Sequence, residues 1–208
     1  NGNYILRQKY IFGLFFLHST DYFAQTAYQS SERLALIYKY ANWNYMQLAG
    51  ANIILPFKAG NWLDSRLTLT GMQMRQRCDN FFDIPFNRKR WTFSATLDNT
   101  FKIKQNLFVE LTGHIQTPAI QGTFDIETFY NLTAGIKWNI AKDKISLSLR
   151  CNDIFNTGNP NLKVRFKGQY LDMDNAYYSR AFNIHLTYRF GGYKERETKS
   201  VDTSRFGH

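Results

Sequence analysis

The chain has 208 residues, the size of one large domain, since a domain averages roughly 150 residues. It carries 26 basic and 16 acidic residues, for a formal net charge of +10, and aromatic residues make up 17% of it. This aromatic content excludes a disordered chain, and the longest charge-free apolar run, residues 10–17, is far shorter than the ~18 to 20 residues of a membrane-spanning helix.

Apolar and polar residues alternate with period two along several long segments, which is the pattern of strands with one buried face. In residues 129–140, Tyr130 and Trp138 lie on one face and Thr133 and Lys137 on the other. The strands predicted in this way cover residues 9–18, 22–29, 33–40, 45–57, 63–75, 91–103, 107–117, 129–140, 145–152 and 178–190. No segment combines the apolar spacing of a helix with a cap and a stop. The sequence therefore predicts an all-β protein of about ten strands.

The predicted connections alternate in length along the chain. Residues 104–106 and 141–144 are short polar turns, whereas residues 78–89, 118–127 and 153–177 form longer loops rich in aromatic, Gly, Pro and Asp residues. Short turns at one end, long loops at the other and strands of roughly 9 to 15 residues are typical of an antiparallel transmembrane β-barrel of the outer membrane. A soluble sandwich or lipocalin shows the same alternation of faces, so alternation alone does not separate the two.

The two faces of the predicted strands differ in a way that favours a membrane barrel. Large aromatic residues gather near the ends of the apolar rows, as in the two interfacial girdles of such barrels. The predicted girdle residues are Trp91, Phe101, Tyr130, Trp138, Tyr178, Tyr188 and Phe190. The opposite rows carry Thr, Ser, Asn and charged residues, which a wet or plugged lumen tolerates. The predicted lumen-facing polar residues are Arg66, Asp98, Glu110, Lys137, Arg150 and Arg189.

We expect residues 1–190 to form barrel strands and residues 191–208 to form a periplasmic tail, because its four basic and three acidic residues nearly cancel, as in a solvated segment. The chain begins with Asn1 and shows no charged-then-apolar leader. This predicts a mature product or a fragment of a longer protein.

No pattern of reactive side chains indicates catalysis. The four histidines, His18, His114, His185 and His208, have no flanking nucleophile motif. The cysteines Cys78 and Cys151 lack metal or redox spacing. We therefore expect no enzyme activity, no cofactor and no metal site.

Two loops carry weaker signals. Asp172, Asp174 and Asn175 offer oxygens for calcium, but without the Gly and distal Glu of a full motif they favour an ordinary polar turn. Basic residues gather at 88–90 and at Lys163, Arg165 and Lys167, where they are expected near the outer surface, beside anionic lipid headgroups or an anionic substrate. Because the aromatic residues belong to apolar faces, a nucleic-acid partner is not expected.

Several segments together resemble one family. Residues 151–156 read CNDIFN, residues 188–194 YRFGGYK and residues 201–207 VDTSRFG. These segments resemble the carboxyl end of the outer-membrane β-barrel family of TonB-dependent-receptor-like proteins found in Bacteroides and relatives. Upstream segments that fit the same family are residues 21–25 (DYFAQ), 56–62 (PFKAGNW) and 117–122 (TPAIQG).

The resemblance implies the carboxyl-terminal barrel portion of an outer-membrane receptor that binds or takes up a nutrient. It also implies a plug domain and contact with the TonB machinery through an amino-terminal part that these residues do not show. The expected partners are outer-membrane lipid and an unidentified nutrient. Two alternatives stay open: a non-transporting structural or adhesive outer-membrane barrel, and a soluble β-barrel that binds an apolar ligand.

Overall fold

The structure is a computed structural model that describes residues 1–7, 9–33, 35–81, 84–141, 144–166, 168–174 and 177–190. These residues form thirteen strands, which confirms the all-β prediction. Their bounds are β1 (Gly2–Leu6), β2 (Tyr10–Gln29), β3 (Leu36–Ala59), β4 (Leu63–Phe81), β5 (Ile84–Lys104), β6 (Leu107–Gln116), β7 (Ala119–Gln121), β8 (Phe124–Ile126), β9 (Phe129–Ile140), β10 (Ile145–Asn152), β11 (Leu162–Phe166), β12 (Gln169–Met173) and β13 (Ala181–Tyr188). Within the described ranges, no helix is long and apolar enough to cross a membrane.

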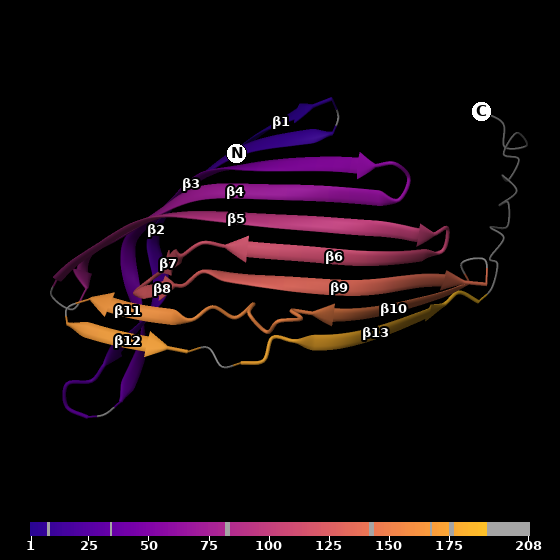
Figure 1. The fold of residues 1–208 in the computed structure, drawn as a ribbon. Coiled ribbons are helices and arrows are strands. Elements are labelled where there is room, and N and C mark those ends of the chain that lie inside the picture. Colours follow the sequence, from indigo (N-terminus) through magenta and orange to yellow (C-terminus); the bar gives the residue numbers. More distant parts are fainter. Residues whose placement is uncertain are drawn as a thin grey trace, which may run out of the picture.

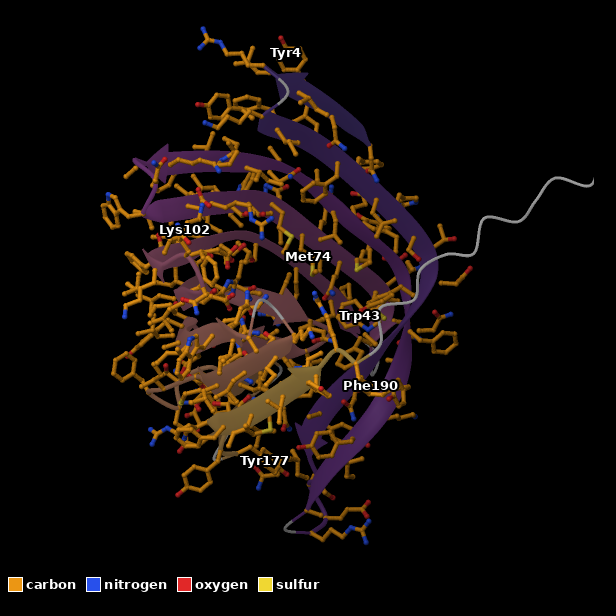
Figure 2. The ribbon with its side chains drawn as sticks, turned by 90° about the vertical axis from the view of Figure 1, so that its right-hand side faces the viewer. Tyr4, Trp43, Met74, Lys102, Tyr177 and Phe190 are labelled. Carbon is orange, nitrogen blue, oxygen red and sulfur yellow. The ribbon has the colours of Figure 1, made fainter. Side chains whose placement is uncertain are left out.

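Nine strands form one large antiparallel sheet in the order β1-β2-β3-β4-β5-β6-β9-β10-β13 (Figure 1). Consecutive strands are neighbours except where β7 and β8 or β11 and β12 intervene. The sheet is strongly curved from β1, which carries Tyr4, down to β13 (Figure 2). Within the described residues β1 pairs only with β2 and β13 only with β10, so the large sheet has two open edges.

Two pairs of predicted strands are single strands in the structure. Residues 9–18 and 22–29 belong to β2 except for Lys9, and residues 33–40 and 45–57 belong largely to β3. The pairing of β2 with β3 keeps one register on both sides of Asp21, which has a φ of 50°. A positive φ in one residue bends a strand without ending its hydrogen-bonded ladder, so the interrupted alternation near Asp21 marks a bend.

Register places polar and apolar residues on opposite faces of the large sheet. Arg66 lies opposite Asp98, and Thr112 and Thr133 continue this polar row across β6 and β9. Leu97 lies in the neighbouring row, whose side chains point to the other face. On that apolar face many large side chains are uncovered, and Ile184, for example, is 76% exposed.

The connections alternate between the two ends of the large sheet. One end holds the tight connections between β3 and β4, between β5 and β6, and between β9 and β10; residues 142–143 of the last lie outside the described part. The other end, here called the long-loop end, holds the three segments predicted as loops. That prediction is wrong for residues 78–89, because β4 continues to Phe81 and β5 begins at Ile84. The other two segments contain short strands.

Those short strands form a second antiparallel sheet in the order β12-β11-β8-β7. β7 and β8 lie between β6 and β9, and β11 and β12 lie between β10 and β13. The two insertions join where Lys163 of β11 pairs with Asp125 of β8. This small sheet packs against the polar face of the large sheet, where the Thr92 hydroxyl of β5 donates to the Pro118 carbonyl at 3.0 Å.

The far part of β2 covers the small sheet (Figure 1). The Ala27 amide donates to Oγ1 of Thr123 at 3.1 Å, and the Gln29 amide donates to Oε1 of Gln169 at 2.7 Å. Two apolar clusters fill this end of the molecule. Their buried members are Ala24, Trp43, Cys78 and Phe81 in one cluster, and Ala27, Phe124 and Val164 in the other.

A glycine sets how closely β2 approaches the small sheet. Gly122, between β7 and β8, has a φ of 55°, and a Cβ added there lies 2.5 Å from the Gln25 carbonyl oxygen and 3.3 Å from Cβ of Ala24. Gly168, between β11 and β12, has a φ of 75°, but an added Cβ meets nothing within 4 Å. Both positions favour glycine for their backbone angle, and only Gly122 also requires it for packing.

Gly122→Ala is expected to loosen β2 from the small sheet, whereas Gly168→Ala carries only the left-handed penalty of about 1 to 2 kcal/mol. Overpacking at Gly122 adds about 1 to 3 kcal/mol. Cys78 reports the loosening, because it is 2% exposed and lies in one cluster with Ala24. In a Cys151→Ala background, Gly122→Ala should speed the reaction of Cys78 with a thiol reagent by about tenfold. Equal rates in the two variants would contradict this account.

Candidate functional site

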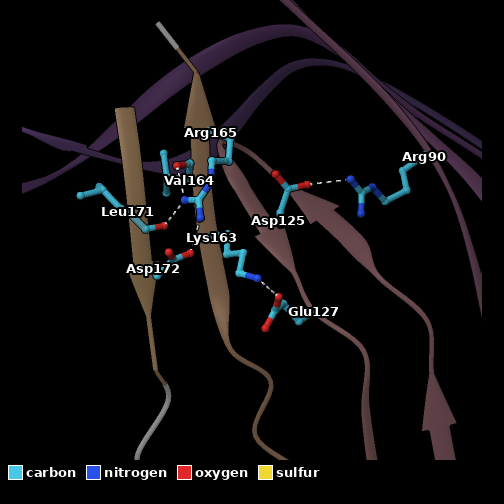
Figure 3. Close-up of polar contacts among 8 residues, drawn as sticks. All are labelled: Arg90, Asp125, Glu127, Lys163, Val164, Arg165, Leu171 and Asp172. Carbon is cyan, nitrogen blue, oxygen red and sulfur yellow. Dashed lines mark hydrogen bonds and ion pairs between the residues drawn. The ribbon is translucent and has the colours of Figure 1, made fainter. Parts of the chain in front are cut away.

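A group of charged residues gathers at the long-loop end, where the small sheet meets the polar face of the large sheet (Figure 3). Arg88 and Arg90 come from β5, and alternation turns both toward the small sheet. Asp125 of β8 faces them, and Lys163 and Arg165 follow on β11. Strand pairing therefore brings together residues that are up to 77 positions apart in the chain.

Asp125 holds both arginines of β5. Its Oδ1 accepts from Nη2 of Arg88 at 2.5 Å and from Nη2 of Arg90 at 3.0 Å. The side chains of Arg88 and Asp125 are only 14% and 17% exposed. Nη1 of Arg88 is buried and has no hydrogen-bond partner among the described residues. Removal of the Asp125 charge would thus leave a largely buried guanidinium without compensation.

The two β11 cations are paired with other carboxylates. Lys163 contacts Glu127, and this hydrogen bond, followed by the carboxylate charge, raises the pKa of the Lys163 ammonium. Arg165 contacts Asp172, and its Nη1 also donates to the Leu171 carbonyl at 2.7 Å (Figure 3). Opposite charges thus alternate across the small sheet.

These residues surround a pocket of about 440 Å³, a size within the range of small-molecule sites. Its lining residues are Arg90, Pro118, Asp125, Ile126, Glu127, Thr128, Lys163 and Arg165. Cationic donors come from β5 and β11, and carboxylate acceptors come from β8 and the residue that follows it, so a polar solute finds both kinds of partner.

A buried aspartate anchors the insertion that carries β11. Asp153, at 5% exposure, follows β10 and accepts from the Gly158 amide at 2.7 Å, the Thr157 amide at 3.1 Å and the Ser179 hydroxyl. Burial acts to raise the pKa of this carboxyl, but these hydrogen bonds and the nearby Arg180 outweigh it and lower the pKa. Asp153 thereby joins the start of the insertion to its end, which fixes where β11 can lie.

The structure locates the predicted lumen-facing residues on the polar face. Nη2 of Arg66 lies 3.4 Å from Oδ2 of Asp98. Glu110, Lys137 and Arg150 share this face by register. They form no ion pair within the described ranges. Arg189 follows β13, and its amide donates to the Lys144 carbonyl at 2.8 Å. Whether this face lines a lumen stays a prediction.

The predicted girdle residues lie at two levels. Trp138 pairs with Leu107 and Phe101 with Leu63, both near the tight turns, and Tyr188 ends β13 at the same end of the sheet. Trp91 and Tyr130 lie nearer the long-loop end; Tyr178 precedes β13 and Phe190 follows it. From Trp91 to Phe101 there are ten steps of about 3.3 Å, which at a tilt of about 40° span a height of about 25 Å. That height equals the apolar band of an outer-membrane barrel.

The weaker sequence signals have different outcomes. Residues 88–90 are divided between the two faces of the sheet, because Arg88 and Arg90 turn toward Asp125 and Lys89 points to the apolar face. Their position near the outer surface stays a prediction. Lys163 and Arg165 are paired with carboxylates, and Lys167 lies outside the described residues.

The candidate metal and histidine positions are placed as follows. Asp172 contacts Arg165, and Asn175 lies outside the described part. Within that part, no group of three or more potential metal-binding His, Cys, Asp and Glu residues occurs. Nδ1 of His114 lies 2.9 Å from the Thr96 hydroxyl, Nδ1 of His185 lies 3.4 Å from that of Thr187, and the ring of His18 packs on Tyr45. His208 and the predicted tail 191–208 lie outside the described residues.

Sequence reasoning missed Asp125, Glu127 and Asp153 as site residues. Asp125 lies in a strand of three residues, too short to show alternation. The clustering of arginines at 88–90 is the sequence signal that could indicate these carboxylates, because a buried arginine needs a negatively charged partner.

Asp125→Asn is expected to weaken the docking of the small sheet by about 3 kcal/mol, because the largely buried Arg88 loses its partner. The matched control is Asp172→Asn, whose ion pair with Arg165 is more exposed and is worth under about 1 kcal/mol. Hydrogen exchange of the β8 and β11 amides measures both changes as free energies of local opening. Similar losses in the two variants would show that burial of the Arg88 contact contributes nothing.

Comparison with known proteins gives one match. The model of a family described as outer membrane protein beta-barrel family matches residues 1–188. A search of curated proteins and a search of solved structures each gave no match. The two-faced antiparallel sheet, the uncovered apolar face and the alternation of tight and long connections are the features of such a barrel. The chain belongs to the outer membrane protein beta-barrel family, and its location is the outer membrane.

Proposed function

We propose that this chain is the barrel portion of a TonB-dependent-receptor-like protein that binds a nutrient and takes it up across the outer membrane. The observation that carries the proposal is the pocket between β5 and the small sheet. It lies on the polar face at the long-loop end, and both positive and negative side chains line it. A solute that enters a barrel from outside the cell meets such a position first.

The open edges support a larger barrel than these strands make alone. Unpaired backbone groups of β1 and β13 find no hydrogen-bond partner in lipid, so each edge has to pair with another strand. In a wide barrel of roughly 22 strands the lumen holds a plug. Glu110, Lys137 and Arg150 then meet water or polar groups of that plug, which accounts for inward charges without ion pairs in the described part.

Energised uptake requires parts that these residues do not supply. A plug domain and the TonB machinery are the partners that the proposal implies for the complete receptor. The role of the present strands is to form the wall of the barrel and to hold the small sheet, with its pocket, near the outer opening.

The proposal places the long-loop end outside the cell, as in other outer-membrane barrels. Ser31 lies exposed at that end, and Gln105 lies exposed in a tight turn at the other. With Cys78 and Cys151 replaced by Ala, Ser31→Cys should react with a membrane-impermeant thiol reagent on intact cells. Gln105→Cys should react only after the cells are broken. The reverse pattern of labelling would overturn the orientation.

Uptake is tested by growth on a panel of single nutrients. A strain without the gene should lose growth on at least one nutrient, the full-length gene should restore it, and removal of TonB should abolish it again. Lys163→Ala in the pocket should lower that uptake roughly tenfold. Lys104→Ala, at the exposed end of β5 far from the pocket, is the control and should leave uptake unchanged. If no nutrient distinguishes the strains, the protein is a structural or adhesive barrel.

A further inference from the structure

The apolar face of the large sheet carries a pair of cations just beyond its aromatic residues. Arg75 of β4 and Lys89 of β5 lie directly opposite each other in the sheet, and both are exposed. The next positions toward the middle of these strands on the same face are Gln73 and Trp91, also opposite each other. The cation pair is therefore about 7 Å farther along the strands than Trp91.

This pair lacks a negative partner. Within the described residues, neither Arg75 nor Lys89 forms an ion pair. The Arg75 guanidinium carbon lies 5.9 Å from the centre of the Tyr45 ring, a contact that leaves its charge uncompensated. Like charges directly opposite each other on a sheet destabilise it. An anion that bridges the two side chains removes this repulsion.

The neighbouring arginine differs from this pair. Arg77 lies on the same face, opposite Asn87, and its Nε donates to Asp79 at 2.6 Å. Asp79 thus compensates the charge of Arg77. Of these three neighbouring cations, only the exposed pair Arg75 and Lys89 lacks an acidic partner within the described residues.

The position of the pair identifies the anion. Trp91 and Phe93 are each 55% exposed, and their rings stack with centres 6.1 Å apart. Exposed aromatic rings lie at the level of the lipid headgroups in a membrane protein, and basic residues just beyond them meet the charged groups of those lipids. Nearer the middle of the same face, Leu69 and Leu97 lie in the apolar band that contacts acyl chains.

We propose that Arg75 and Lys89 bind the phosphate of an anionic lipid in the leaflet at the long-loop end. Trp91 and Phe93 pack against the same lipid below its headgroup. The site lies on the lipid-facing side of β4 and β5, opposite to the pocket, and does not depend on what the barrel transports.

The test uses the full-length protein in neutral detergent, titrated with phosphatidylglycerol or with phosphatidylcholine and followed by native mass spectrometry. The double variant Arg75→Gln with Lys89→Gln should bind phosphatidylglycerol about 10- to 30-fold more weakly than the unchanged protein. Its affinity for phosphatidylcholine should stay the same. The matched control, Arg77→Gln with Lys104→Gln, also removes two charges and should bind phosphatidylglycerol within twofold of the unchanged protein.

A second measurement separates lipid binding from a structural role. In phosphatidylcholine vesicles the double variant should be at least as stable as the unchanged protein, because it lacks the repulsion between Arg75 and Lys89. In vesicles with equal parts of phosphatidylglycerol the order should reverse. Unchanged phosphatidylglycerol binding by the double variant, or an equal loss in the control, overturns the proposal. Displacement of the lipid by millimolar inorganic phosphate overturns it in favour of a site for soluble anions.

Discussion

A strand that crosses a bilayer has to give each backbone N–H and C=O group a partner, because hydrocarbon offers none. In this chain the antiparallel sheet that runs from β1 to β13 gives seven of its nine strands a hydrogen-bonded neighbour on each side. Once the ladder is continuous, register fixes the face of each side chain. The division between a polar face with Arg66 and Asp98 and an apolar face with Leu97 and Ile184 follows from it.

The same ladder brings the two insertions together. β6, β9, β10 and β13 are neighbours in the sheet, so the segments inserted after β6 and after β10 leave at the same end. At that end β8 pairs with β11, and β2 extends far enough to cover both, with Gly122 in close approach. The pocket is lined by three parts of the chain that are remote in sequence, namely Arg90 of β5, the segment 118–128 and two residues of β11.

The long strands could be predicted because alternation is a local property that depends only on the sequence. The predicted range 129–140 coincides with β9, and 145–152 coincides with β10. The strands of the small sheet could not be predicted in this way. β7 and β8 have three residues each, and their strand conformation depends on pairing with residues such as Val164 that lie far along the chain.

The sequence-based predictions are wrong where tertiary contacts override the local pattern of residues. Residues 78–89 are rich in polar and aromatic residues, a composition that predicts a loop. They continue β4 and β5 because Phe81 and Phe86 pack with Trp43 in a buried aromatic cluster. Likewise, the gap in alternation at Asp21 indicated two strands, whereas the ladder to β3 passes through it. In both cases the conformation of the segment depends on contacts with another strand, which the local sequence does not show.

In the tripeptide Arg88-Lys89-Arg90, neighbouring side chains lie in different environments because they point to opposite faces of the sheet. By composition it is a single basic patch, but a strand sends successive side chains to opposite faces. Arg88 and Arg90 contact Asp125 of the small sheet, while Lys89 points to the face that carries Trp91. The positive charge of the tripeptide is thereby divided between two surfaces. At the pocket a carboxylate compensates it, and on the lipid-facing surface no acidic residue of the described part does. One strand of a barrel can in this way serve a solute site on one side and a lipid site on the other, with a single residue step between them.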